Sequence, residues 1–97
     1  TVKEAEEAAR SVALVVLGVV RAELGSLDKV VRLVKTLGMV NCTPEFTQQP
    51  QVINGFSNLL VEVFGEKAGT GTRSAVGMSS LPMGWPVEIE CLFQVKG

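Results

Sequence analysis

The sequence contains no histidine and no tyrosine, and aromatic residues make up only 5% of the chain. Without histidine there is no Ser-His-Asp triad, no Cys-His pair and no conventional zinc site. Hydrolysis by those routes is therefore excluded within this chain. The candidates for solution chemistry are reduced to a few charged side chains.

The charged residues are almost evenly balanced. The chain carries 9 Lys and Arg residues against 10 Asp and Glu residues, which gives a formal net charge of −1 at pH 7. A chain without a basic field cannot gather phosphates electrostatically. Nucleic acid is therefore disfavoured as a partner.

Long hydrophobic runs and secretory features are also lacking. The apolar run from Val12 to Val20 is interrupted by Gly18 and is too short to span a bilayer, so we expect a buried helix and no membrane anchor. No charged region precedes it that would indicate a signal peptide. The two cysteines, Cys42 and Cys91, are predicted to be reduced, partly buried thiols rather than a disulfide, and we expect a cytoplasmic protein.

Apolar surface is abundant for a chain of this size. The 97 residues fit one domain, and 46% of them are apolar. A short chain leaves a large fraction of its surface uncovered when it folds alone. We therefore expect self-association. Because the chain begins on a helix-capping residue rather than on methionine, we also expect further sequence upstream.

Two segments are predicted to be helices. Thr1 and Glu4 match a capping box, and apolar residues then recur at helical spacing until Gly25, which supplies the stop. A second helix is predicted to be entered through Pro50 and to end at Gly65. Its apolar face consists of Val52, Phe56, Leu59, Leu60, Val63 and Phe64.

Three segments are predicted to be strands. The first, from Val30 to Val40, is rich in β-branched residues and is expected to be buried largely on both faces. The last two, Arg73 to Ser80 and Pro86 to Val95, are joined by a Pro/Gly turn and are expected to pair as a hairpin. The intervening segment from Glu66 to Thr72 contains three small turn-forming residues and is expected to be a mobile loop. Its glycines are not arranged as in a P-loop.

The resulting element order, α-β-α-β-β, indicates an α+β sandwich in which both helices cover one face of a mixed sheet. The other face would then be apolar and bare, which is unusual for a soluble monomer. A symmetric oligomer is the simplest way to cover it.

Arg73 is the first candidate site residue. A guanidinium at the start of a strand, directly after a glycine-rich loop, presents a planar fork suited to bidentate capture of a carboxylate or phosphate. The alternative is a surface arginine paired with Glu66 or Glu88.

Glu88 and Glu90 point to the same side of the last strand. Two like charges on one face can raise the pKa of a carboxyl group, and such a group can orient or deprotonate water. The alternative is a solvated strand edge. In the expected hairpin register Arg73 lies about 20 Å from the level of Glu88, so the two could cooperate only across a subunit interface.

The C-terminal residues resemble a known family. Arg73-Ser-Ala-Val followed by Leu81-Pro82 and by Val87-Glu88-Ile-Glu90 is similar to the C-terminal signature of the Rid (reactive intermediate deaminase, YjgF-like) family. Upstream segments, including Thr1-Val-Lys-Glu-Ala5 and Val52-Ile-Asn-Gly-Phe56, are similar to the family's two helices. The resemblance covers essentially all of residues 1–97.

The resemblance implies a chorismate-mutase-like fold whose first two or three strands are missing here, and a homotrimer with ligand clefts between subunits. It also implies hydrolysis of imines and enamines to 2-oxo acids and ammonia, without a metal or cofactor. Arg73 would hold the substrate carboxylate and Glu88 would position the attacking water, so both are the expected catalytic residues. Ser74 and Ala75 would line the substrate, with backbone groups near Ala75 contacting the imine nitrogen.

Two positions depart from the archetypal branch of the family, which carries Cys and Glu where this chain has Ala75 and Gly77. Two alternatives to a deaminase therefore stay open. One is a non-catalytic trimer that binds small carboxylates or a protein partner through Arg73. The other is the endoribonuclease or translation-inhibitor activity associated with the family, against which the neutral charge and the lack of histidine argue.

Overall fold

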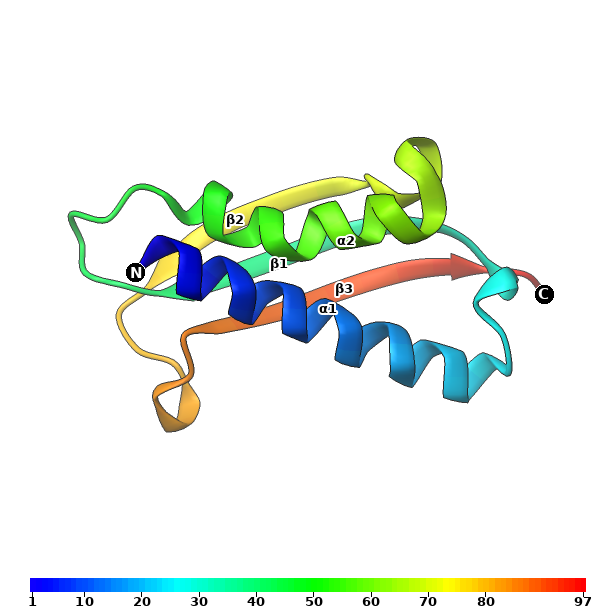
Figure 1. Cartoon of the computed structure of the whole chain (residues 1–97), viewed down its shortest axis with the longest axis horizontal. Helices are drawn as coiled ribbons and strands as arrows, with labels where there is room; N and C mark the ends of the chain where they lie inside the picture. The colour runs from blue at the N-terminus through cyan, green and yellow to red at the C-terminus, as the bar shows by residue number, and fades with distance from the viewer.

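The computed structural model describes all 97 residues. It contains two helices packed on one face of a three-stranded sheet (Figure 1), so the predicted α+β arrangement and element order are confirmed. Single 3-10 turns lie at Leu27–Lys29 and Pro82–Gly84. The main elements are α1 (Val2–Leu24), β1 (Val30–Asn41), α2 (Gln49–Gly69), β2 (Thr72–Met78) and β3 (Val87–Val95).

The strand order is β2-β1-β3, so the predicted hairpin between the last two strands is wrong. β1 pairs with β2 in parallel and with β3 in antiparallel orientation. Parallel neighbours need a long crossover, which α2 provides, and the chain then passes to the opposite edge of β1 before β3 begins. The backbone N–H of Asn41 donates to the Pro86 carbonyl at 2.9 Å and fixes that return.

Helix α1 begins and ends where the sequence predicts. The Thr1 hydroxyl accepts from the Glu4 backbone and the Glu4 side chain reaches back, which completes the capping box. At the other end Gly25 adopts a left-handed conformation with φ 86°. Ala9, Ala13 and Leu17 form the buried face of the helix. No helix of the structure combines the length and the hydrophobicity that crossing a bilayer would require.

Helix α2 is interrupted at Gly65, where φ is 85° and ψ is 163°. This is the predicted end of the regular helix, because only glycine adopts such angles readily. The chain then makes one more helical turn to Gly69. The expected loop over Glu66 to Thr72 is therefore wrong for its first half, which is helical.

The core lies between the helices and the sheet. Phe56 and Leu60 of α2 and Leu33 of β1 are fully buried there, and Phe64 meets Phe93 edge to face with ring centroids 6.2 Å apart. The packing is tight between helices as well as against the sheet. A Cβ atom at Gly55 would lie 2.0 Å from the Glu6 carbonyl oxygen, so glycine allows α1 and α2 to approach.

Strand β1 is covered by helices on one face only in the protomer, whereas burial on both faces was predicted. Its buried residues follow an uneven spacing because register shifts occur between Val30 and Arg32 and between Leu33 and Lys35. Each shift adds one residue to β1. Val30 and Leu33 therefore both face the helices, although they are three residues apart and strict alternation would place them on opposite faces. The irregular pattern in the sequence thus came from bulges rather than from two buried faces.

The other face of the sheet, here called the open face, is not covered within the protomer. Apolar side chains on it remain accessible, with exposed fractions of 41% for Val76, 38% for Met78 and 61% for Leu92. Polar groups lie between them, and Arg32 Nε donates to Gln94 Oε1 at 2.9 Å. The open face is a mixed surface of apolar and charged side chains.

The close approach of the helices gives a stability prediction. Gly55→Ala should lower the free energy of unfolding by about 3 kcal/mol, because the new methyl group meets backbone that cannot move away alone. Gly18→Ala is the matched control. Gly18 is also helical, but a Cβ atom added there would meet no atom within 4 Å apart from the backbone of its own helix, so the substitution should raise stability by about 0.5–1 kcal/mol. Urea denaturation measures both, and equal effects would contradict the proposed close packing.

Candidate functional site

Arg73 lies on β2, an edge strand, and its guanidinium is held by helix α2. Its Nη1 donates to Asn54 Oδ1 at 2.8 Å and to Ser57 Oγ at 3.1 Å. Both acceptors are uncharged. The alternative pairing of Arg73 with Glu66 or Glu88 is not observed, since the ion pairs of the protomer involve neither Arg73 nor those glutamates.

The backbone explains why these groups meet. Arg73 is level with Thr36 on the central strand, and Thr36 is 1% exposed on the face that the helices cover. Side chains level with each other on neighbouring strands share a face, so Arg73 points to the helix side. Asn54 and Ser57 are three residues apart on α2 and therefore lie next to each other on its surface.

The two residues that follow Arg73 alternate between faces. Ala75 is level with Gly38 and packs against the apolar cluster around Val52 on the helix side. Ser74 lies on the open face, where its hydroxyl accepts from Lys35 Nζ at 2.8 Å. Of the two expected substrate-lining residues, only Ala75 therefore shares a face with Arg73.

Glu88 and Glu90 are exposed on the open face of β3, and their predicted orientation to the same side is confirmed. Glu88 is level with Met39 and Glu90 with Leu37 on the central strand. Neither carboxylate is in an ion pair within the protomer.

Within one protomer Arg73 and Glu88 do not converge. They lie on opposite edges and opposite faces of the sheet, at levels Thr36 and Met39 of the central strand. The two residues are two strand spacings apart across the sheet and three residues apart along it, and each of these distances is about 10 Å. Because the two directions are perpendicular, the Cα atoms are roughly 14 Å apart. The expected separation of about 20 Å rested on a hairpin that does not form, so it is replaced by this value.

Asn54 and Ser57 were missed in the sequence. They lie at the margin of the apolar face of the second helix, where Val52, Phe56, Leu59 and Leu60 are the core residues. Two polar side chains at helical spacing beside such a face are the signal that was available. Their partner could not be identified, because it depends on the parallel pairing of β2 with β1.

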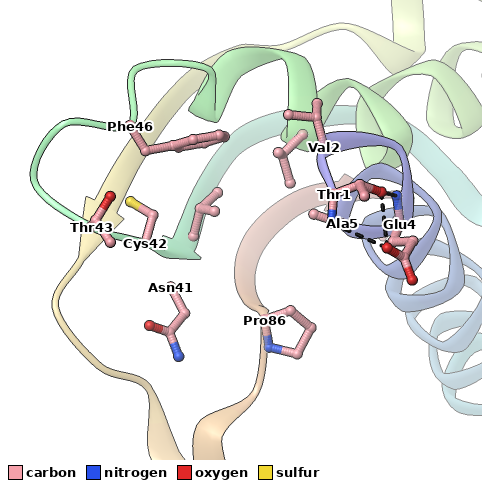
Figure 2. Close-up of a pocket in the computed structure, with 11 residues that line it drawn as sticks. Thr1, Val2, Glu4, Ala5, Asn41, Cys42, Thr43, Phe46 and Pro86 are labelled. Atoms are coloured by element: carbon pink, nitrogen blue, oxygen red, sulfur yellow. Dashed lines mark hydrogen bonds and ion pairs between the residues drawn. The ribbon is translucent and has the colours of Figure 1, made fainter.

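The largest cavity lies at the far end of the sheet from Arg73 and measures about 610 Å³. Figure 2 shows it between the first turn of α1, the end of β1 and the start of β3. None of the expected site residues lines it. Its walls are Thr1, Val2, Glu4, Ala5, Val40, Asn41, Cys42, Thr43, Phe46, Val52 and Pro86.

Both cysteines are free and half-buried, as predicted. Cys42 lines the largest cavity and accepts a long hydrogen bond from Gln49 Nε2 at 3.6 Å. Cys91 lies on the helix side of β3, level with Thr36. Burial, and to a smaller extent the neighbouring Glu90 carboxylate, raises the pKa of the Cys91 thiol above its ordinary value. No three His, Cys, Asp or Glu side chains gather where they could hold a metal ion.

Comparison with known proteins gives one curated relative and two informative structures. The chain is 46% identical over 96 residues to protein TCP17 of Trypanosoma cruzi, and the match covers 99% of this chain and 60% of that protein. It superposes on Atu1372 of Agrobacterium tumefaciens, whose function is unknown, with a TM-score of 0.95 and 43% identity, covering 99% of this chain and 62% of that one. No family model matches the chain.

A more distant structure shares the fold alone. It is a candidate endoribonuclease from Shewanella oneidensis MR-1, with a TM-score of 0.91 and 23% identity, and the match covers 98% of this chain and 62% of that one. The chain thus spans about 60% of the length of the proteins it matches.

The raised pKa of Cys91 predicts the pH dependence of its reactivity. In a Cys42→Ser protein, alkylation of Cys91 by iodoacetamide should reach its midpoint at a higher pH in the folded than in the urea-unfolded protein. The free energy of unfolding should fall as the pH rises past the unfolded thiol's pKa, because the unfolded state loses its proton first. Cys91→Ala should remove that part of the slope, and an unchanged slope would contradict the assignment.

Proposed function

We propose that this chain is the C-terminal part of a Rid-like domain, with the chorismate-mutase-like fold of that family, and that it serves the hydrolysis of 2-imino or enamine acids. The observation that carries the proposal is the Arg73 guanidinium, which is oriented by two neutral groups and has no acidic partner in the protomer. Such a cation is suited to an anionic ligand. The Rid-like signature that begins at Arg73 supports a carboxylate as that ligand.

In the proposed reaction Arg73 binds the substrate carboxylate and leaves the C=N carbon open to water. Glu88 accepts a proton from that water as the oxygen attacks the carbon, and the proton passes to the nitrogen. The tetrahedral intermediate then expels ammonia and forms the C=O bond of the 2-oxo acid. The balance is one imine and one water consumed for one oxo acid and one ammonia, with no redox step.

Because Arg73 and Glu88 lie on opposite faces of the sheet, this mechanism needs Glu88 from a neighbouring protomer. The proposed assembly is the homotrimer that the Rid resemblance implies, with clefts between subunits. The exposed apolar side chains of the open face, among them Val76 and Leu92, support self-association. Arg73 lies on the edge strand β2, so in such an assembly it would be close to the neighbouring protomer.

Two other functions are alternatives to the proposed deaminase. A trimer that binds carboxylates without turning them over is favoured by Ala75 and Gly77, where the archetypal deaminases have Cys and Glu. Endoribonuclease activity is suggested by the Shewanella protein, whose fold this chain shares. A net charge of −1 provides little attraction for RNA.

The deaminase proposal predicts that the full-length protein accelerates ammonia release from an imino acid generated in the assay by an amino-acid oxidase. Arg73→Ala should lower kcat/KM by about 100-fold or more, because the substrate is no longer positioned. Glu88→Gln should lower kcat by about 100-fold or more through loss of the base. Glu90→Gln, on the same face of the same strand, is the matched control and should retain activity.

The outcomes separate the three functions. Equal ammonia release by wild type and Arg73→Ala would exclude deamination at this site. Arg73-dependent carboxylate binding without turnover would favour the non-catalytic trimer. RNA cleavage that survives stringent purification and disappears in Arg73→Ala would favour the ribonuclease.

The trimer proposal predicts that Val76→Asp dissociates the assembly, because a carboxylate would be buried without a partner in the interface. Val63→Asp is the matched control, since Val63 has a similar exposed fraction, 43% against 41%, but lies on helix α2 away from the open face. Light scattering coupled to gel filtration measures the mass. A monomeric wild-type protein would refute the trimer.

A further inference from the structure

Both acceptors on α2 contact the same nitrogen of Arg73. Asn54 Oδ1 and Ser57 Oγ lie 2.8 Å and 3.1 Å from Nη1. The nitrogen carries two N–H groups, so the two acceptors account for its full capacity to donate. No other group of the protomer accepts from Nε or Nη2 of this side chain.

We propose that Asn54 and Ser57 are positioning residues, which hold the guanidinium so that its Nε–Nη2 edge receives the ligand carboxylate. This inference rests on the proposed role of Arg73 as the carboxylate anchor. A planar guanidinium offers bidentate binding along its Nη1–Nη2 end or along its Nε–Nη2 side. With Nη1 occupied, only the side edge retains two parallel N–H donors.

The arrangement leaves the charge of the arginine available. A carboxylate partner would compete with the ligand by neutralising the guanidinium, whereas an amide and a hydroxyl orient it without doing so. The acceptors are half-buried on a regular part of α2, one turn apart, which fixes them relative to each other. Holding the fork before the ligand arrives reduces the conformational entropy lost on binding.

The ligand class that fits this edge is a planar carboxylate approached side-on, as in a 2-oxo or 2-imino monocarboxylic acid. Its second functional group would extend along β2 toward Ala75, which shares the helix side of the sheet with Arg73. The side chains of Asn54 and Ser57 hydrogen-bond to the arginine and, in this proposal, act on the ligand only through it.

The test uses pyruvate as the probe and the full-length protein with Asn54→Ala, Ser57→Ala and the double substitution. Each single substitution should weaken pyruvate binding by about 3- to 10-fold, because the arginine must then be immobilised on binding. Ser57→Thr retains the hydroxyl and should restore affinity. Asn58→Ala is the matched control, since Asn58 is the next residue on α2 but lines a surface hollow with Glu6 and Arg10.

A second measurement separates positioning from a general effect on folding. In the wild-type protein, pyruvate should shift the ¹H–¹⁵N resonance of Arg73 Nε, and the Nη1 resonances should show slowed rotation that both alanine variants lose. The melting temperature should change little in these variants. A Nε resonance that pyruvate leaves unmoved, or unchanged affinity in the double variant, would overturn the proposal.

The controls distinguish this inference from the proposed function. If Arg73→Ala binds pyruvate as well as wild type, the carboxylate anchor itself fails. If Arg73→Ala loses binding while the Asn54 and Ser57 variants keep it, only the positioning role fails. Pyruvate binding that depends on all three residues, in a protein that releases no ammonia from imines, would support the positioning role and reject deamination.

Discussion

The hydrogen bonding of β1 along both of its edges determines the rest of the structure. Because β2 and β3 each pair with this strand and not with each other, they are separated by its full width. The side chains that the C-terminal signature places close together in sequence are thereby distributed to two edges and two faces of the sheet. Arg73 and Glu88 therefore lie on opposite edges and opposite faces of the sheet, and the proposed joint action of the two side chains on one small ligand would need a second copy of the chain.

The pairing of β2 and β3 with β1 also determines which side chains surround the Arg73 guanidinium. The parallel pairing of β2 brings the guanidinium under α2, where its neighbours are an amide and a hydroxyl. The acidic side chains of the last strand lie across the sheet, on the other face. The guanidinium therefore has no carboxylate partner within the chain.

Much of the fold was accessible from the sequence, and the site only in part. The capping box at Thr1, the stop at Gly25 and the alternation of β3 are local signals, and each was read correctly. The pairing of β2 was predicted wrongly. A short Pro/Gly segment between two strands is compatible with a hairpin, but also with a passage of the chain to the other edge of the sheet. Asn54 and Ser57 lie next to Arg73 only because β2 pairs in parallel with β1. The spacing of residues within the second helix could not predict this contact.

The two bulges of β1 also bear on how the chain folds. Residues 30–40 pair with residues 87–95, so this ladder closes a loop that includes α2 and β2. Long-range pairing of this kind is slow to form. The unevenly spaced buried side chains fit their partners in one alignment, since sliding β3 by two residues would bring its apolar positions opposite the wrong bulge. The uneven spacing of the buried residues in β1 therefore favours one register for β3 over its neighbours.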